Sequence, residues 1–332
     1  MKTQSSHYLK AGLKIALVAG LLYFLTMKGF ISIEATKKGL FQWDQSGPAM
    51  IALFLLTFFG ALRWQWLLQA QGIHLPWVRT LQLHFIGQFF NIALPGAVSG
   101  DLVKAFYVAH EAPGMRGRAF GSILFDRVAG VSALVLVSAG ALFFSYRSGS
   151  GASLFKAVEL LILISGFGVI CFYTYLFFVR EHHDPVLRGF RTIEKRFSRA
   201  SSLTRIYEGL RHYHNHRWVV FKVFMLSIGV HLVVAGSCLL FAHALGDATI
   251  DPLSVFVVVP LGLLVTAVPI FPAGIGTGHA AFGWLFLLLG SQRGADVFSL
   301  FALLQLLSGS IGGLVYLRFR SHEPKPVFLE SA

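Results

Sequence analysis

Charged residues are scarce in this chain of 332 residues. Asp, Glu, Lys and Arg together make up 13% of it, which is about half the share that a soluble domain normally carries. Hydrophobic residues make up 55%, and the mean hydropathy is +0.67. The longest polar stretch, residues 180–217, is too short for a sizeable soluble domain. This composition excludes a sizeable soluble domain and indicates a polytopic membrane protein.

Cysteine is nearly absent as well. The two cysteines, Cys171 and Cys238, both lie inside apolar runs, which favours packing residues over a disulfide or a metal pair. The histidines at residues 182–183 and 212–216 lack Cys or carboxylate partners at metal-ligand spacing, so we expect no metal site. The chain also lacks a Walker loop, a nucleophile elbow, an HExxH pair and a DxD-type cluster. We therefore expect no cofactor and no enzymatic activity.

Acidic residues are outnumbered by Lys and Arg, 15 to 28, which gives a formal net charge of +13. The positive charge is spread over loops between apolar segments. That distribution argues against nucleic acid and for cytoplasmic loops that meet anionic lipids. We expect membrane lipids as partners, with anionic headgroups favoured, and the sequence is compatible with a homodimer or a partner lipid-modifying enzyme.

Six apolar runs approach or exceed the roughly 20 residues that cross a bilayer. They cover residues 11–30, 48–70, 119–145, 154–179, 218–245 and 296–318. No convincing small-residue cleavage site follows the first run, so we expect a retained span rather than a signal peptide. The runs predict an all-α polytopic membrane protein with about six full transmembrane helices.

Two further segments, residues 79–112 and 252–290, are each interrupted by proline and glycine. The inserts read FFNIALPGAVSGDLVKAF over Phe89–Phe106 and AVPIFPAGIGTGHAAF over Ala267–Phe282. Proline removes a hydrogen-bond donor and glycine loosens the backbone, so each segment is predicted to be two short helices around a break. Irregular backbone at membrane depth survives only where protein buries it or water reaches it. Paired breaks in the two halves of a membrane protein point to a substrate site.

The charge of the loops decides whether these segments cross the membrane. Residues 180–217 carry nine Lys and Arg against four Asp and Glu, and the tail carries Arg318, Arg320 and Lys325. Both regions should therefore be cytoplasmic. All basic regions lie on the cytoplasmic side only if both interrupted segments turn back within the membrane. If only one of them crossed, the charges at the two ends of the chain would require opposite orientations. We predict two re-entrant hairpins in a multi-pass protein with both termini in the cytoplasm.

The two halves then share the order span, span, hairpin, span, in opposite orientations. We predict an inverted-topology repeat with residues 1–150 as the first membrane repeat, 151–320 as the second and 321–332 as a cytoplasmic tail. The first hairpin would enter from the cytoplasm and the second from outside, so that their tips meet near the midplane. The alternative is six or eight helices packed with kinks and no repeat.

The connector between the halves, at about 185–216, places apolar residues at helical spacing with arginine and lysine on the other faces. This pattern predicts one or two amphipathic helices on the cytoplasmic leaflet. An elbow that joins the halves is a sufficient role for them.

Ionisable residues inside spans are candidates for binding, because each costs about 2.5–3.5 kcal/mol to insert. Arg63 either snorkels in an aromatic belt with Trp64 and Trp66 or turns inward toward a lipid phosphate. Asp101 and Lys104 lie three apart at the start of a helix. They form a local ion pair and cap, or they belong to a loop that presents backbone N–H groups to an anion.

Asp126 and Arg127 are adjacent in a span and point about 100° apart, so we expect each to pair with the charged residues named above. A purely structural salt-bridge network is the alternative. His279 either carries a proton near neutral pH or is a hydrogen-bonded core residue. We predict no catalytic and no metal-ligating residue. The predicted substrate-binding residues are Arg63, Asn91, Pro95, Gly96, Ser99, Gly100, Asp101, Lys104, Asp126, Arg127, Pro272, Gly274, Gly276, Thr277 and His279.

Four motifs spread over most of the chain are typical of a known family. They are Arg63-Trp64 with Leu67-Leu68, GQFFNIALPGAVSGDLVKAF over Gly87–Phe106, DRVAG over Asp126–Gly130 and PIFPAGIGTGHAAF over Pro269–Phe282. In them the chain resembles the lysylphosphatidylglycerol synthase transmembrane-region family, also called flippase-like integral membrane proteins. The resemblance implies a protein of the bacterial cytoplasmic (inner) membrane that moves lipids or lipid-linked intermediates between leaflets.

Two departures qualify what the resemblance implies. In the multiple peptide resistance factor, a similar region is joined to a cytoplasmic aminoacyl-transferase domain. The residues after Phe319 are too few to supply that domain, so we expect no lysyl transfer by this chain. Many relatives are expected to carry an acidic residue where this chain has His279.

We predict a lipid flippase or transporter that moves anionic, aminoacylated or isoprenoid-linked lipids. Arg63, Lys104 and Arg127 would hold phosphate, while Asp101 and Asp126 would balance charge or meet a cationic headgroup. A second hypothesis is a membrane subunit that presents a lipid substrate to a separate synthase or glycosyltransferase. A third is a membrane-embedded enzyme with Asp101 and Asp126 as acid and base, which the lack of a nucleophile or metal motif disfavours.

Overall fold

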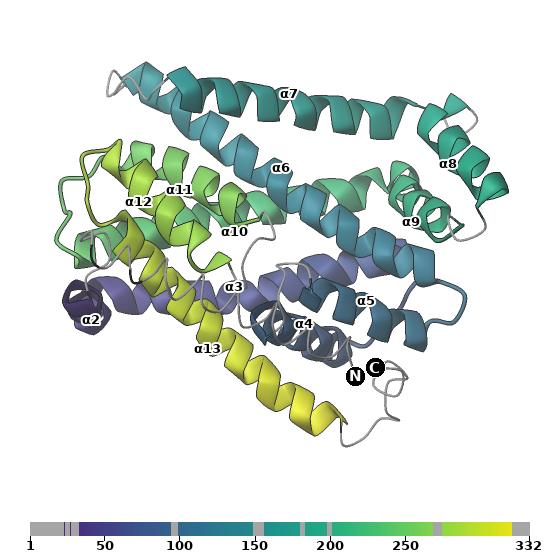
Figure 1. Cartoon of the computed structure of the whole chain (residues 1–332), viewed down its shortest axis with the longest axis horizontal. Helices are drawn as coiled ribbons and strands as arrows, with labels where there is room; N and C mark the ends of the chain where they lie inside the picture. The colour runs from purple at the N-terminus through teal and green to yellow at the C-terminus, as the bar shows by residue number, and fades with distance from the viewer. Residues whose placement is uncertain are drawn as a thin grey trace.

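The computed structural model describes Tyr23, Met27 and residues 33–93, 99–148, 156–179, 183–197, 201–267 and 274–320, and within these residues it contains helices and no strand (Figure 1). The elements are α2 (Ile33–Phe41), α3 (Trp43–Ala70), α4 (Trp77–Ala93), α5 (Ser99–Glu111), α6 (Arg116–Ser148), α7 (Lys156–Phe178), α8 (Pro185–Arg196), α9 (Ser201–Arg211), the 3₁₀ helix η3 (His212–Asn215), α10 (Arg217–Ala244), α11 (Pro252–Thr266), α12 (Thr277–Leu287) and α13 (Gly294–Arg320). The predicted all-α membrane architecture is confirmed.

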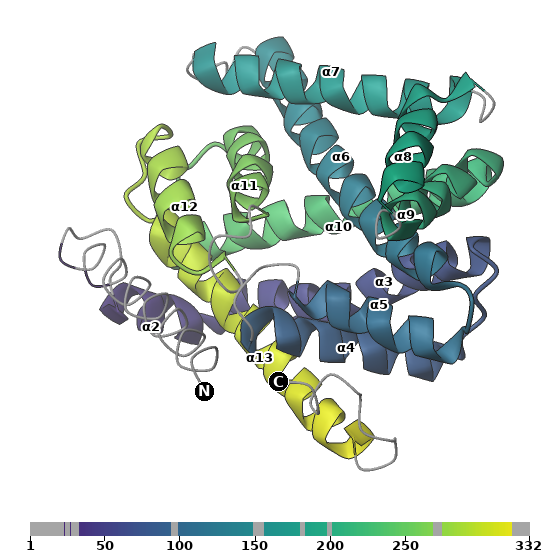
Figure 2. The same ribbon diagram turned by 45° about the vertical axis from the view of Figure 1, so that its right-hand side comes forward.

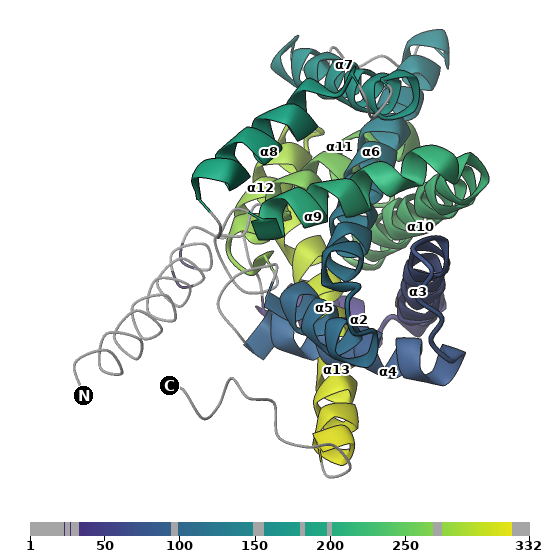
Figure 3. The same ribbon diagram turned by 90° about the vertical axis from the view of Figure 1, so that its right-hand side faces the viewer.

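Five of these helices, α3, α6, α7, α10 and α13, are long and apolar enough to cross a membrane. They agree with five of the predicted spans to within a few residues, and α3 begins earlier, at Trp43. The predicted span at 11–30 lies outside the described residues apart from Tyr23 and Met27. Figures 1 and 3 place α7 at the periphery, with α6 between it and the rest of the bundle. Its large apolar side chains, such as Leu163 and Phe167, are exposed, as a lipid-facing helix requires.

The first interrupted segment is a helical hairpin of α4 and α5, which pack on each other. Arg79 near the start of α4 forms an ion pair with Glu111 at the end of α5, with 2.6 Å between Nη2 and Oε1. The helices approach closely because both carry glycine at the contact. A Cβ atom on Gly100 would lie 1.7 Å from the carbonyl oxygen of Gly87. Small residues at such contacts let membrane helices pack backbone against backbone.

The second interrupted segment repeats this arrangement with α11 and α12, which also pack on each other. The hydroxyl of Ser291, after α12, donates to the carboxylate of Asp247, before α11, and joins the outer ends of the two helices. Gly262 makes room for the ring of Phe282, since a Cβ atom there would lie 2.6 Å from a ring carbon. The breaks themselves fall almost entirely outside the described residues.

Each hairpin packs against the last long helix of the opposite half of the chain. The first packs through α4 on α13, and the second packs through α11 on α6 (Figure 2). Between them α3 and α10 pack on each other. Each contact therefore has an equivalent in the other half of the chain. The contact of α4 with α13 corresponds to that of α11 with α6, and α3 corresponds to its own partner α10.

The connector forms the two short helices α8 and α9, and α9 packs on α6. Arg211 is 2% exposed and donates to the carbonyl groups at the end of α7, including that of Leu176 at 2.9 Å. The same guanidinium lies 3.1 Å from the fully buried carboxylate of Asp184. This buried pair locks the connector onto α7, and apolar residues such as Ile193 and Phe197 remain exposed on its outer side.

Replacing Gly100 with Ala should destabilise the first hairpin, because the new methyl group would overlap the carbonyl of Gly87. Overpacking of this kind costs about 1–3 kcal/mol or more. The matched control is Gly140→Ala on α6, where a Cβ atom would meet nothing within 4 Å. Thermal unfolding in detergent should show a lower Tm for the Gly100 variant and an unchanged or higher Tm for the control. Equal Tm values would contradict the close contact.

Replacing Asp184 with Asn should loosen the connector in a way that depends on pH. Burial acts to raise the pKa of Asp184, but hydrogen bonds from Tyr175, Leu187 and Tyr207 and the charge of Arg211 outweigh it and lower that pKa. The carboxylate therefore stabilises the fold fully above its ordinary pKa of about 4, and this contribution disappears as the pH falls through the lowered value.

Hydrogen exchange in the connector measures the effect. The Asn variant should exchange faster than the wild type at neutral pH. The difference should begin to shrink below about pH 4 and close once the pH falls past the lowered pKa of Asp184. A difference that persists unchanged in acid would show that the carboxylate charge has no part in holding the connector.

Candidate functional site

Asp101 is the centre of a group of charged residues at the start of α5. Its carboxylate lies 2.8 Å from Nζ of Lys104 and accepts a hydrogen bond of 2.5 Å from Nε of Arg127 on α6. Asp101 and Lys104 are both 5% exposed. The local ion pair predicted from their spacing is present, and Asp101 also joins the first hairpin to α6.

Arg63 and Asp126 form a second ion pair, between α3 and α6. The guanidinium donates to both carboxylate oxygens, at 2.7 and 3.0 Å, which is the bidentate geometry of a strong pair. Its Nη1 also donates to the hydroxyl of Ser227 on α10 at 3.0 Å. Arg63 thus turns inward rather than snorkelling, and it ties three long helices together.

The two pairs are neighbours in the fold. Trp64 follows Arg63 on α3, is fully buried, and lies under Lys104, whose Nζ is 4.9 Å from a ring centroid of the indole. Asp126 and Arg127 are adjacent on α6 and pair in different directions. The predicted cross-pairing with earlier charged residues is therefore what the structure contains.

Together these residues form a network of three cations and two carboxylates, Arg63, Lys104, Arg127, Asp101 and Asp126, which leaves one positive charge in excess. The Arg63 pair is balanced, so the excess lies in the Asp101 group. Within that group the Arg127 side chain is 39% exposed and that of Lys104 is 6% exposed. Arg127 is therefore the more accessible cation of the group.

Arg127 lines a groove of about 430 Å³ between α6, α7 and α11. The rest of the lining is mostly apolar and comes from Val128, Val131, Ser132, Val135, Ser165, Gly168, Val169, Phe172 and Leu264. A charged group at one position on an apolar wall matches the chemistry of a lipid, with a polar head and a hydrocarbon chain.

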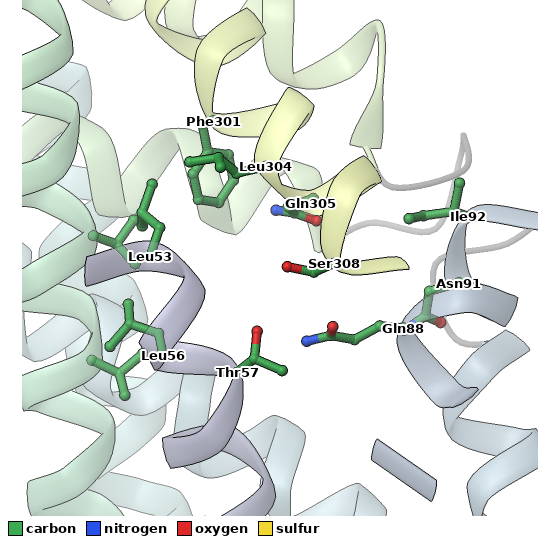
Figure 4. Close-up of a pocket in the computed structure, with 12 residues that line it drawn as sticks. Leu53, Leu56, Thr57, Gln88, Asn91, Ile92, Phe301, Leu304, Gln305 and Ser308 are labelled. Carbon is green, nitrogen blue, oxygen red and sulfur yellow. The ribbon is translucent and has the colours of Figure 1, made fainter. Parts of the chain in front are cut away.

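A second cavity, of about 290 Å³, lies between α3, α4, α10 and α13 (Figure 4). We call it the central chamber. It is lined by Leu53, Leu56, Thr57, Gln88, Asn91, Ile92, Val230, Val234, Phe301, Leu304, Gln305 and Ser308. Of the predicted site residues that the structure describes, only Asn91 is among them.

Four polar residues of the chamber, Thr57, Gln88, Gln305 and Ser308, escaped the sequence reasoning. These residues are not ionisable and do not belong to a proline–glycine break, which are the two features that mark a binding site in the sequence of a membrane protein. A usable signal was present: Gln88 and Asn91 lie three apart, as do Gln305 and Ser308, so each pair shares a helix face.

The residues around the first break hold the hairpin tip together. The carboxamide oxygen of Asn91 accepts from the backbone N–H of Gly100 at 2.9 Å, and the Ser99 hydroxyl donates to the Phe90 carbonyl at 2.8 Å. Pro95, Gly96 and Pro272, also predicted to bind substrate, lie outside the described residues.

The residues after the second break make local bonds too. His279 accepts from the N–H of Gly276 at 3.3 Å, and its Nε2 lies 3.1 Å from the hydroxyl of Ser299 on α13. Thr277 donates to the carbonyl of Gly274, and both glycines adopt positive φ, 68° at Gly274 and 95° at Gly276. His279, 5% exposed, is thus a hydrogen-bonded core residue at the start of α12.

Removing one partner of the Arg63–Asp126 pair should destabilise the protein more than removing both. A single Arg63→Leu or Asp126→Leu change leaves a buried charge without its partner, which costs on the order of 3 kcal/mol. The double variant removes both charges and should recover much of that loss. Reversible unfolding in mixed micelles measures the three free energies of unfolding, and strictly additive losses would contradict a direct pair.

Comparison with known proteins agrees with these features. The family model for the lysylphosphatidylglycerol synthase TM region matches residues 12–321, which include both hairpins and all five residues of the charged network. No curated protein and no solved structure matches the chain. The chain therefore belongs to the family of the lysylphosphatidylglycerol synthase transmembrane region, whose members are membrane proteins involved in lipid handling.

Proposed function

We propose that this protein transports lipids between the leaflets of the bacterial cytoplasmic membrane, with the lipid phosphate held at Arg127. The observation that carries the proposal is the exposed guanidinium of Arg127 on the wall of the apolar groove between α6, α7 and α11. A phospholipid could lay its chain along the valines of α6 while its phosphate meets the guanidinium. Arginine suits this role because its planar fork pairs with phosphate oxygens in a bidentate fashion.

Phosphate binding would act on the first hairpin through Asp101. Arg127 holds the carboxylate of Asp101, so a phosphate at Arg127 competes for the same guanidinium. Asp101 keeps Lys104 as its partner when the link to Arg127 weakens. The contact between α5 and α6 would then loosen, and substrate binding would be coupled to movement of the hairpin.

The hairpins are suited to alternate access because their helices are short. The helices α4, α5, α11 and α12 have 17, 13, 15 and 11 residues, fewer than the roughly 20 that span a bilayer. We propose that the hairpins are re-entrant, enter from opposite faces and belong to an inverted repeat, as the exchange of contacts between halves supports. Rocking of one repeat against the other then exposes the site to each side in turn.

The basic connector fixes the orientation in this proposal. Basic residues of α8 such as Arg188, Arg191 and Lys195 would face the anionic cytoplasmic leaflet, with the exposed Ile193 and Phe197 inserted at the interface. Both termini are then cytoplasmic.

Transport in proteoliposomes tests the function. Fluorescent phosphatidylglycerol in the inner leaflet should reach the outer leaflet, where dithionite quenches it, faster than in protein-free vesicles. Arg127→Gln should slow this by about tenfold, since it removes a charge-assisted contact to phosphate worth about 1.5–3 kcal/mol.

The matched control is Arg147→Gln, an exposed arginine on the same helix. It should transport like the wild type. Wild-type rates equal to those of protein-free vesicles, with intact protein, would reject transport. Equal rates for the two variants would reject Arg127 as the phosphate site.

A further inference from the structure

We propose that the central chamber binds the uncharged, hydroxyl-rich part of a lipid headgroup, such as a glycerol or a sugar ring. The inference builds on the proposed lipid transport and adds the chemistry by which this protein would select a headgroup. Its basis is a set of hydrogen-bonding side chains that face one cavity, in which two hydroxyl groups and one carboxamide oxygen have no partner within the described residues.

Thr57 and Ser308 supply two hydroxyl groups to the chamber. Both residues are buried, at 6% and 8% exposure, and neither hydroxyl takes part in a hydrogen bond within the described residues. Four serines of the long helices α6, α10 and α13 behave differently. Ser132, Ser227, Ser299 and Ser310 each donate to the carbonyl four residues before them, which is the ordinary way for a hydroxyl in a helix to be satisfied.

Gln88 supplies a carboxamide from the first hairpin. Its Nε2 lies 3.5 Å from Nε2 of His84, while its buried Oε1 has no hydrogen-bond partner among the described residues. Figure 4 shows the Gln88 side chain extending from α4 into the same space as the Thr57 and Ser308 hydroxyls, with Gln305 beside Ser308. A buried carbonyl oxygen without a donor costs about 1–3 kcal/mol, so a ligand that donates to it gains that amount.

Among the residues that the structure describes, the lining contains no ionisable side chain. A phosphate or an ammonium group placed there would meet no countercharge, and burying an unpaired charge is far more costly than burying a hydroxyl. Hydroxyl and carboxamide groups each donate and accept, which matches the hydroxyls of a polyol. The remaining lining is aliphatic and aromatic, as sites for small molecules usually are, and suits the carbon skeleton of such a group.

The position of the chamber would couple its occupant to the first hairpin. Gln88 and Asn91 belong to α4, and Asn91 also holds the hairpin tip through the N–H of Gly100. The opposite wall comes from α13, against which the hairpin packs. A polyol that bridges α4 and α13 would therefore favour one position of the hairpin.

Binding of four lipids with the same acyl chains tests the proposal in purified, full-length protein by native mass spectrometry. The probes are glucosyl diacylglycerol, phosphatidylglycerol, phosphatidic acid and phosphatidylcholine. Glucosyl diacylglycerol and phosphatidylglycerol carry headgroup hydroxyls and should bind about fivefold or more tighter than the other two, as expected for one or two net hydrogen bonds. Tighter binding of glucosyl diacylglycerol identifies a neutral glycolipid as the source of the hydroxyls, and tighter binding of phosphatidylglycerol identifies a polyol phospholipid.

Variants of the lining locate the effect. Gln88→Leu and Ser308→Ala should each remove most of the preference. Thr57→Val removes a hydroxyl with almost no change in shape, so a weaker preference in this variant would not result from misfolding. Ser310→Ala, an exposed serine two residues from Ser308, is the matched control and should bind like the wild type. An unchanged preference in all the lining variants, or no preference in the wild type, would show a chamber that holds water only and would overturn the proposal.

The two proposals fail separately. Hydroxyl-dependent binding that the lining variants abolish, in a protein that moves no lipid, would reject transport and leave the chamber as a binding site. A transport rate that depends neither on headgroup hydroxyls nor on the lining variants would reject the chamber as a headgroup site and would still support transport.

Discussion

The arrangement of this protein depends on the ion pairs of Asp101. A carboxylate in the membrane region is tolerable only when cations accompany it, and Asp101 has two, Lys104 from its own helix and Arg127 from α6. The cost of a lone charge therefore fixes where α5 can lie. The neighbouring Arg63–Asp126 pair fixes α3 against the same helix, so the two electrostatic links together orient the first hairpin, α3 and α6.

Glycine makes these electrostatic links geometrically accessible. The aliphatic part of the Lys104 side chain crosses Gly87, where a Cβ atom would lie 2.7 Å from Cδ of Lys104. On the other side of α4, a Cβ atom on Gly312 of α13 would lie 2.0 Å from the carbonyl oxygen of Phe85. Hydrocarbon supplies no hydrophobic drive between helices, so contacts of this kind carry the packing. The hairpin is thus held by small residues on one side and by charge on the other.

The long helices, the two breaks and the cross-pairing of Asp126 and Arg127 are predictable from the sequence, because each follows from a local rule about length, proline or the cost of charge. The central chamber is not predictable in this way. Thr57 and Ser308 are common residues in membrane helices, and only the packing of α3 against α13 decides that their hydroxyls meet a cavity instead of their own helix. Nor does the sequence decide between an inward and a snorkelling Arg63, since that depends on Asp126 and Ser227 being within reach.

The separation of charged from uncharged polar groups follows a physical logic for a protein that handles lipids. Charges in a low-dielectric setting attract any ion of opposite sign, so they retain an anionic lipid without distinguishing its head. Hydroxyl and carboxamide groups contribute little to such attraction, but they discriminate strongly, because each is left unpaired by the wrong ligand. A protein that bound phosphate at Arg127 in the groove and hydroxyl groups at Gln88 and Ser308 in the central chamber would assign retention and recognition to two separate places. Since Gln88 lies on α4 and Asp101 on α5, both events would act on the same hairpin.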